Sequence, residues 1–189
     1  NFTWAKWVTP SRDLISTFKQ EGDEVRFKES VVYYDCGWSN YYPSDNYPFM
    51  YKCRSANSSI IKYRYADVLL LKAEALIMQD TPDLEGAADI IDEVRDRAKL
   101  GALSSSTRSN KDALLNALLK ERRLELAFEG QRWFDLVRLD KVEEVMNAVH
   151  AKDSGRKAQV YTYDKNSYRL PIPQSVIDAN DKIHQNPGY

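Results

Sequence analysis

The chain is poor in the residues that carry most enzyme chemistry. Its 189 residues include two histidines, His150 and His184, and two cysteines, Cys36 and Cys53. No G-x-S-x-G, P-loop, H-E-x-x-H or G-x-G-x-x-G pattern occurs, which leaves few general bases or nucleophiles. The histidines are far from the cysteines and there is no C-x-x-C pair, which argues against a zinc site. We therefore expect no enzymatic activity, no metal and no cofactor.

Excess charge and long apolar runs are also lacking. Lys plus Arg number 27 against 28 for Asp plus Glu, and the net charge of −1 gives no support for nucleic-acid binding. The sequence has no run of eighteen apolar residues and no basic-then-apolar leader, which taken alone indicates a soluble protein. Hydrophobic residues at 43% are ordinary for a globular protein, and the length suffices for one domain with a real core.

Aromatic side chains, by contrast, are abundant, with 12 Tyr and four Trp. Residues 35–57 are dense in turn formers, which cannot continue a helix or a central strand. Aromatic rings beside Asn and Asp suit sugars, because a pyranose face is apolar and its rim needs polar partners. The candidate ligand-binding residues are Trp38, Tyr41, Tyr42, Asn46 and Tyr47. The alternative is a loop folded over the helices, with its rings buried between them. Trp133 is expected in the core, with sugar stacking as its alternative.

Cys36 and Cys53 bracket this aromatic stretch. A cell-surface location would permit a disulfide between them. Closing a loop of this length would stabilise the fold by about 3 kcal/mol if the bond is unstrained. Two reduced, half-buried thiols are the alternative.

Residues 61–150 are predicted to form a helical body. The segment 63–78 is apolar on more than half of its circumference and contains small alanines, so we expect a helix packed on two sides. A second helix follows, with Thr81 as its N-cap, and runs to about Ala98. Such a pair fits a tetratricopeptide-like hairpin. We therefore predict a mainly α fold, with a tetratricopeptide-like helical hairpin core, long irregular loops and a little short β structure.

Shorter elements are predicted around this hairpin. They are a helix capped by Ser11, a strand at 30–34, a third helix from a capping box at 109–112 to about Glu129, a further helix at 131–149, a strand at 160–163, an extended segment at 168–173 and a helical turn at 175–179. Tyr189 is expected to anchor the end of the chain. We divide the chain into an aromatic segment (1–60), the helical body (61–150) and an extended C-terminal segment (151–189), packed as one compact unit.

The third helix carries charges where its apolar rows should meet the core. Leucines at spacing four lead directly onto Glu121, Arg122 and Glu125. Buried charges are costly unless paired, so we predict that carboxylates hold Arg122, with Glu125 reaching it at i+3. The predicted structural ion network comprises Glu121, Arg122, Glu125, Glu129, Arg132, Asp135 and Arg138. The alternative is an active-site carboxylate pair, but the neighbouring arginines should keep both groups ionised and unable to act as acids.

Several motifs resemble those of one known family. The run KERRLELAFEGQRWFDLVR at 120–138 resembles the C-terminal signature of the SusD/RagB family of bacterial surface nutrient-binding lipoproteins. Residues 61–75 are similar to the family's "RYAD..LL.AEA" helix, and 94–98 resemble its "VR.RA" helix end. Residues 168–173 and 185–189 are similar to its "PIP…QNPGY" terminus.

The resemblance implies a non-enzymatic binding protein at the outer-membrane surface. Family members act as lids on a SusC-like TonB-dependent transporter and capture oligosaccharides such as starch fragments, or in some members peptides. They are much longer, with a signal peptide, a lipidated cysteine and an N-terminal helical half, so this chain looks like the C-terminal portion of such a protein. The competing hypothesis is a helical scaffold that binds another protein and no glycan.

Overall fold

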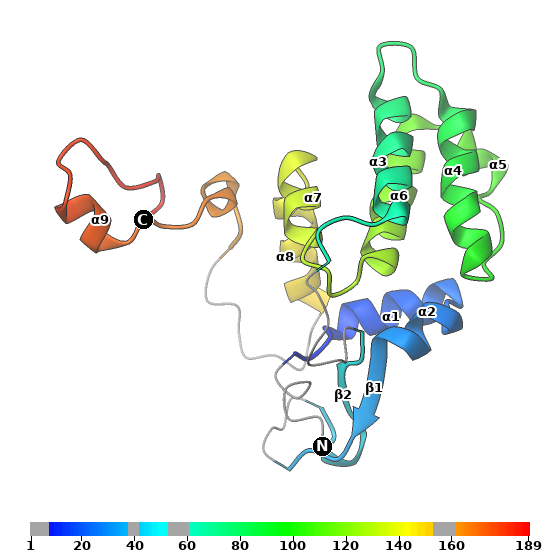
Figure 1. Cartoon of the computed structure of the whole chain (residues 1–189), viewed down its shortest axis with the longest axis horizontal. Helices are drawn as coiled ribbons and strands as arrows, with labels where there is room; N and C mark the ends of the chain where they lie inside the picture. Colours follow the sequence, from blue (N-terminus) through cyan, green and yellow to red (C-terminus); the bar gives the residue numbers. More distant parts are fainter. Residues whose placement is uncertain (1–7, 38–41, 53–60, 153–161) are drawn as a thin grey trace. The chain divides into compact units, whose positions relative to one another are not determined.

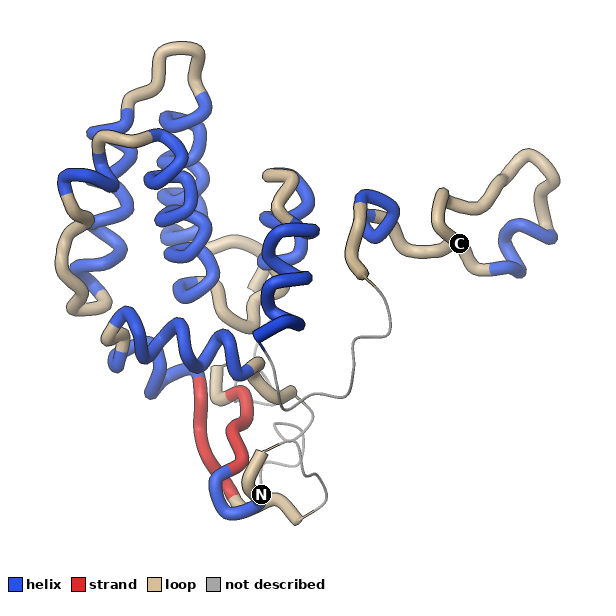
Figure 2. The backbone as a smooth tube through the Cα atoms, turned by 180° about the vertical axis from the view of Figure 1, so that it is seen from behind, coloured by secondary structure: helices blue, strands red, loops and turns tan. Residues whose placement is uncertain are grey.

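The computed structural model describes residues 8–37, 42–52, 61–152 and 162–189. The chain divides into two units, residues 1–132 and 133–189. Unit 1 contains α1 (Arg12–Glu21), α2 (Glu24–Ser30), β1 (Val31–Tyr34), η2 (Ser44–Asn46), β2 (Tyr47–Met50), α3 (Tyr65–Met78), α4 (Leu84–Arg97), α5 (Ser105–Arg108) and α6 (Lys111–Glu125). From the unit boundary onward follow α7 (Arg132–Arg138), α8 (Val142–Lys152), η3 (Lys165–Tyr168) and α9 (Gln174–Asp178). The predicted mainly α class is confirmed (Figures 1 and 2).

The core of unit 1 lies between α3, α4 and α6, which run side by side (Figure 1). Ala73 of α3 and Ala87 and Ala88 of α4 are fully buried, and their small side chains let the helix axes approach. Longer side chains fill the remaining space, namely Leu70, Ile77, Ile91, Leu114 and Leu118. The tetratricopeptide-like hairpin of α3 and α4 is therefore present as predicted, and α3 is packed on two sides.

At one end of these helices lie α1 and α2, with the β1–β2 hairpin beyond them (Figures 1 and 2). The Ser11 hydroxyl caps α1 as predicted, accepting a hydrogen bond from the Leu14 amide at 3.1 Å. Gly22 ends the helix in the left-handed region, with φ of 67°, where glycine has no steric penalty. From α1, Phe18 packs against Leu124 of α6 in a second buried cluster.

Two helices begin at residues other than those predicted. The N-cap of α4 is Asp83, whose carboxylate accepts a hydrogen bond from the Gly86 amide at 2.9 Å; Thr81 lies further upstream. The N-cap of α6 is Asn110, whose side-chain oxygen accepts from the Ala113 amide at 2.9 Å, one residue after the predicted Ser109. In both cases an Asx side chain supplies the cap, and such residues rank above threonine at this position.

A helix that the sequence did not indicate also occurs in unit 1. We predicted no helix over residues 24–30, but α2 occupies them. Its buried residues are Arg26 and Ser30, so no apolar periodicity marks the helix. Asp23 caps it, accepting from the Arg26 amide at 3.2 Å. This missed helix supplies an arginine that is central to the ion network described below.

The predicted irregular stretch contains a strand. In β2, Tyr47 pairs with Tyr34 of β1, and Pro48 lies opposite Tyr33. Proline is tolerated because, in this two-stranded sheet, β2 is an edge strand and the missing N–H need not break a ladder. Cys36 is buried with a free thiol, which favours the reduced alternative, and Cys53 lies outside the described residues.

In unit 2, the single helix predicted at 131–149 is two helices, α7 and α8. The break falls at Asp140, whose φ of 54° lies in the left-handed region and cannot continue a right-handed helix. Of the strand predicted at 160–163, the described residues 162 and 163 adopt no strand, and the others lie outside the described ranges. The predicted helical turn near the end of the chain is confirmed as α9. Tyr189 is 58% exposed and donates a hydrogen bond to the Arg169 carbonyl at 3.2 Å, within its own unit.

Candidate functional site

The last turn of α6 places two carboxylates in the interior of unit 1. Glu121 and Glu125 are 1% and 2% exposed, as the charge pattern predicted. The helix ends at Glu125, four residues earlier than predicted, and Phe128 follows with a left-handed φ of 67°. A bend therefore forms directly beside the buried charges.

Glu125 is held by three arginines from three different segments. Arg97, at the end of α4, reaches its carboxylate at 2.5 Å, and Arg64, which precedes α3, reaches it at 2.5 Å. Arg26 of α2 binds the same group at 3.1 Å and also binds Glu121 at 2.6 Å. The Arg26 guanidinium therefore joins two carboxylates one turn apart, and the three arginines together tie α2, the start of α3 and the end of α4 to α6.

The partner of Arg122 differs from the prediction. Arg122 is 2% exposed and its Nη1 lies 2.9 Å from Oδ1 of Asp67 in α3, while Glu125 is engaged by the arginines named above. Asp67 Oδ1 makes no hydrogen bond in the described structure, so its contact with Arg122 is an ion pair without hydrogen-bond alignment. The predicted partner three residues away on α6 is thus replaced by one 55 residues away.

The other members of the predicted network also make polar contacts. Glu129 is paired with Lys52 at 2.5 Å and with Arg64 at 2.8 Å. Arg132 donates a hydrogen bond to the Leu119 carbonyl at 3.1 Å. In unit 2, the residues Asp135 and Arg138 form an ion pair at 2.7 Å along α7. The sequence pattern therefore identified the carboxylates correctly but missed Arg26, Lys52, Arg64 and Arg97.

The pKa values of the two buried carboxyl groups shift in opposite directions. Burial tends to raise the pKa of Glu125, but its arginine partners outweigh burial and lower it below the usual value. Burial raises the pKa of Glu121 despite the charges of Arg26 and Arg95. Glu125 is therefore a fixed anion, which agrees with a structural role for that group and leaves it unsuited to act as a general acid.

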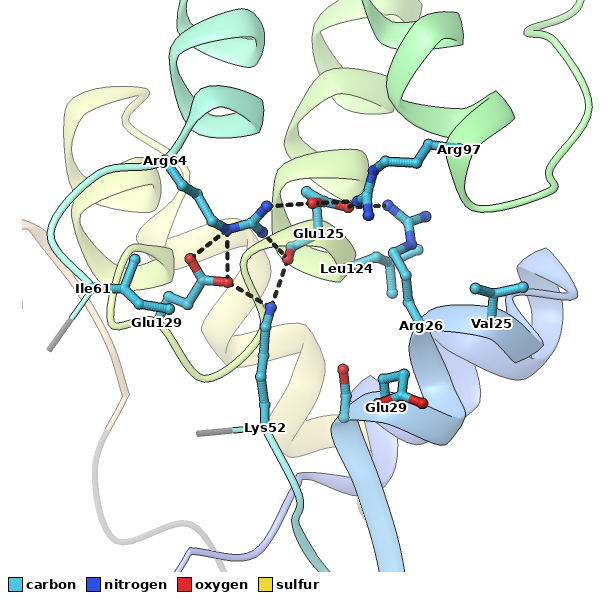
Figure 3. Close-up of a pocket in the computed structure, with 11 residues that line it drawn as sticks. Val25, Arg26, Glu29, Lys52, Ile61, Arg64, Arg97, Leu124, Glu125 and Glu129 are labelled. Carbon is cyan, nitrogen blue, oxygen red and sulfur yellow. Dashed lines mark hydrogen bonds and ion pairs between the residues drawn. The ribbon is translucent and has the colours of Figure 1, made fainter. Parts of the chain in front are cut away.

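A pocket of about 310 Å³ opens beside this network, entirely within unit 1 (Figure 3). Its polar wall contains Arg26, Lys52, Arg64, Arg97, Glu29, Glu125 and Glu129. Val25, Ile61 and Leu124 add apolar side chains to the lining. Four cations therefore face three carboxylates around a space of the size that small-molecule sites occupy. We call this space the arginine pocket.

The predicted sugar-binding residues are only partly described. Trp38 and Tyr41 lie outside the described residues. Tyr47 is 3% exposed and stacks on Phe49, with ring centroids 5.0 Å apart. Tyr42 donates a hydrogen bond to the Pro10 carbonyl at 3.0 Å, and Asn46 is exposed. The rings of Tyr42 and Tyr47 thus contribute to local packing, and the ligand-binding role stays a prediction.

A second pocket, of about 710 Å³, lies in unit 2 and was not predicted. Aromatic rings contribute to its wall from Trp133, Tyr163 and Tyr189, and the Trp133 and Tyr163 ring centroids are 6.4 Å apart. Polar side chains also line it, namely Thr162, Asp164, Asn166 and Ser167. Its aromatic residues are separated by 26 to 56 positions in the sequence, so no local pattern could have revealed the cluster. We call this space the aromatic pocket.

Other site types find no support in the described ranges. Among those residues, no group of three or more His, Cys, Asp or Glu could hold a metal ion. Within the same ranges, every helix falls short of the length and apolar character that a membrane span requires. Among the described residues, we take the arginine pocket and the aromatic pocket as the candidate sites.

Solved structures share this fold. A SusD superfamily protein from Bacteroides thetaiotaomicron matches 95% of this chain and 38% of its own length, with a TM-score of 0.66 and 28% identity. A laminarin-binding SusD-like protein matches 96% of this chain and 40% of its own, with a TM-score of 0.58 and 27% identity. A further SusD superfamily protein, from Bacteroides vulgatus, shares the fold with a TM-score of 0.70 at 23% identity.

Sequence comparisons agree with the structural ones. SusD-like protein P38 of Formosa agariphila is 41% identical over 139 residues, which are 70% of this chain and 25% of that protein. SusD-like protein P2 of the same organism is 34% identical over 142 residues, which are 72% of this chain and 27% of that protein. The chain thus spans about a quarter of the length of these curated relatives. The model of the SusD family matches residues 45–189. The chain belongs to the SusD family.

Proposed function

We propose that this protein captures neutral oligosaccharides of the glucan type at the cell surface, without catalysis, for uptake. Its partner would be a SusC-like TonB-dependent transporter of the outer membrane, and its anchor a lipid on a part of the protein outside this chain. Membership of the SusD family supports this proposal, as does the laminarin-binding protein with which the chain shares its fold. The observation that carries it is the aromatic pocket.

The aromatic pocket combines the two surfaces that a sugar requires. The rings of Trp133, Tyr163 and Tyr189 offer apolar faces on which a pyranose ring can stack. Hydroxyl groups on the sugar rim need polar partners, and Asp164 and Asn166 lie in the same wall. These two side chains are already ordered, since Asn166 donates a hydrogen bond to Asp164 at 3.2 Å. A preordered rim loses less conformational entropy when it binds a ligand.

Fluorescence titration tests this proposal, because tryptophan emission reports a sugar stacked on an indole ring. Starch-derived and laminarin-derived oligosaccharides are titrated into the chain, and both emission and heat of binding are followed. Trp133→Ala removes the pocket's tryptophan and is expected to weaken glucan binding about tenfold, the loss of one stacking contact. Trp38→Ala is the matched variant, because Trp38 belongs to the ligand-binding set predicted from the sequence.

The outcomes separate the candidate sites. Loss of binding in Trp133→Ala alone supports the aromatic pocket. Loss in Trp38→Ala alone would instead assign binding to the stretch with Tyr42, Asn46 and Tyr47. Glucan binding that survives both substitutions would contradict both sites. A panel without any response would exclude glucan capture by this chain.

The second candidate function is a helical scaffold, or a peptide-binding uptake component. The observation that favours it is the outer face of α3, where Tyr65 is 72% exposed and Val68 and Met78 are each 53% exposed. Exposed apolar side chains along one helix are typical of a surface that binds another protein. Retention by an immobilised helical peptide, lost in Val68→Asp but unchanged in Lys111→Asp at an exposed position of α6, would favour this function over glycan capture.

A further inference from the structure

The arginine pocket contains a buried cationic nitrogen without a partner. The side chain of Arg26 is 7% exposed. Its Nε binds Asp23 at 2.5 Å and its Nη1 binds Glu121 and Glu125. Its Nη2 is buried and makes no hydrogen bond to any residue that the structure describes. Buried donors in folded proteins are nearly always satisfied, so an orphan N–H group on a pocket-lining residue indicates an acceptor from elsewhere.

A second guanidinium group with unused donors lies beside it. Arg97 Nη2 binds Glu125 Oε2 at 2.5 Å, and Arg26 Nη1 binds the same oxygen at 3.1 Å. Within the described ranges, the remaining nitrogens of Arg97 make no hydrogen bond, and its side chain is 60% exposed. Two positive groups that converge on one carboxylate oxygen repel each other. A second anion between them would reduce that repulsion and accept hydrogen bonds from guanidinium N–H groups that have no partner among the described residues.

Apolar side chains also line the pocket. They are Val25, Ile61 and Leu124, and Val25 and Ile61 are 46% and 37% exposed. A simple inorganic anion would make no use of these side chains. A ligand with a carboxylate at one end and an apolar ring face beside it would contact both charged and apolar side chains. A planar carboxylate also matches the fork of a guanidinium group better than a tetrahedral anion does.

We propose that the arginine pocket binds the carboxylate of a hexuronate residue, so that the protein also accepts acidic oligosaccharides. This proposal rests on the proposed function, because it assumes that the ligand is a glycan. The carboxylate would accept hydrogen bonds from Arg26 and Arg97, and the sugar face would contact Val25 and Leu124 on the same side of the pocket (Figure 3). Because the Arg97 side chain is largely exposed, it can change rotamer to admit the ligand without disturbing the core.

The test compares two disaccharides that differ at one carbon. Cellobiouronic acid carries a carboxylate where cellobiose carries a hydroxymethyl group, and both are titrated calorimetrically into the full chain. We expect the acid to bind at least about tenfold more tightly than cellobiose, as two charge-assisted hydrogen bonds allow. The advantage should decrease with added NaCl, because ionic interactions at an open pocket are screened. Equal affinity for the two sugars would overturn the proposal.

Variants separate the pocket from general charge effects. Arg97→Gln should remove most of the preference for the acid; this exposed side chain can be replaced without emptying the core, and the urea midpoint checks the fold. Arg169→Gln removes an exposed arginine in unit 2 and should leave the preference unchanged. Arg26→Gln is unsuitable alone, since its loss would strip partners from three buried carboxylates. A preference that persists in Arg97→Gln would contradict the assignment.

Glutarate provides the remaining comparison, because it has carboxylates but no sugar ring. Val25→Ser should weaken the binding of cellobiouronic acid while leaving any glutarate binding unchanged. Glutarate binding as tight as that of the acid sugar would show that acidic side chains or peptides suffice, and would overturn the hexuronate assignment. If laminarin oligosaccharides bind through Trp133 but the acid shows no preference, only this inference fails. If the acid binds through Arg97 and neutral glucans do not bind, the proposed neutral-glucan function fails instead.

Discussion

Replacing Glu125 by glutamine tests whether the buried network holds unit 1 together. The substitution keeps the shape of the side chain and removes only its charge. It leaves Arg26, Arg64 and Arg97 around a neutral group that cannot balance them. We expect the variant to fold to the same secondary structure and to unfold at a clearly lower urea concentration.

The expected size of the loss follows from the exposure of each partner. Arg97 is 60% exposed, so its pair with Glu125 contributes at most about 1 kcal/mol. The pairs with Arg26 and Arg64, whose side chains are 7% and 27% exposed, are shielded from water. Removing one partner of a buried pair costs about 3–5 kcal/mol. Since Arg26 and Arg64 each keep another carboxylate, we expect a loss near the lower end, about 3 kcal/mol.

Urea unfolding followed by circular dichroism measures this loss. The matched control is Glu93→Gln, since Glu93 is exposed on α4, and its free energy of unfolding should change by less than about 0.5 kcal/mol. A Glu125→Gln variant as stable as that control would refute a stabilising role for the network. An unchanged urea dependence of the free energy in both variants would exclude altered compactness as the cause.

The stability that Glu125 contributes should depend on pH. The pKa of Glu125 is lower in the folded chain than its ordinary value of 4.5, so its stabilising contribution is complete above that value. The contribution disappears as the pH falls through the lowered folded pKa. Glu121 acts in the opposite direction, because its folded pKa is raised and its contribution declines as the pH rises through that value. The difference between wild type and Glu125→Gln should therefore shrink below pH 4.5, which acid titrations of the urea midpoint can measure. A difference that stays constant at acid pH would contradict the lowered pKa.

Four further substitutions test the structure at three separate points. Asp83→Ala removes the α4 cap and should lower the free energy of unfolding by about 1 kcal/mol, whereas Thr81→Ala should change the urea midpoint little. A larger loss in Thr81→Ala than in Asp83→Ala would show that Thr81 is the cap, as the sequence predicted. Arg122→Met leaves a buried carboxylate without its cation and should cost about 3–5 kcal/mol, and a neutral result would show that the pair is dispensable. Hydrogen bonding to Asp140 raises the pKa of Tyr168 to about 12, so Asp140→Asn should shift one tyrosine back towards pH 10 in a spectrophotometric titration; an unchanged curve would contradict that hydrogen bond.

Helices with an apolar repeat were predictable, because the residues that such a helix buries recur at helical spacing within its own sequence. The α3–α4 hairpin shows leucine, isoleucine and alanine at helical spacing, and α1 shows a serine cap with a glycine at its other end. In contrast, α2 turns an arginine and a serine inward, and no pattern based on hydrophobicity can detect that. Its burial depends on carboxylates that lie 95 and 99 residues away.

The same limit applies to the ion network. Charges at core positions of α6 are visible in the sequence, and the requirement that buried charges be paired follows from elementary electrostatics. The choice of partners does not follow, because helical spacing ranks only neighbours three or four residues away. Glu125 in fact binds arginines 28, 61 and 99 residues distant. The sequence alone therefore predicts that Glu125 is paired, whereas the fold determines which side chains pair with it.

These distant partners also explain why the arginine pocket lies beside the network. Because Glu125 binds α2, the residue before α3 and the end of α4, it sets how those three segments diverge from the bend after α6. Segments held apart by charged side chains cannot close on one another as apolar ones do, and a space remains between them. The arginines that stabilise Glu125 also line that space, and two of them keep unused donors. A structural network and a ligand site can therefore share residues here: Glu125→Gln should lower stability, whereas Arg97→Gln should change binding with little effect on the fold.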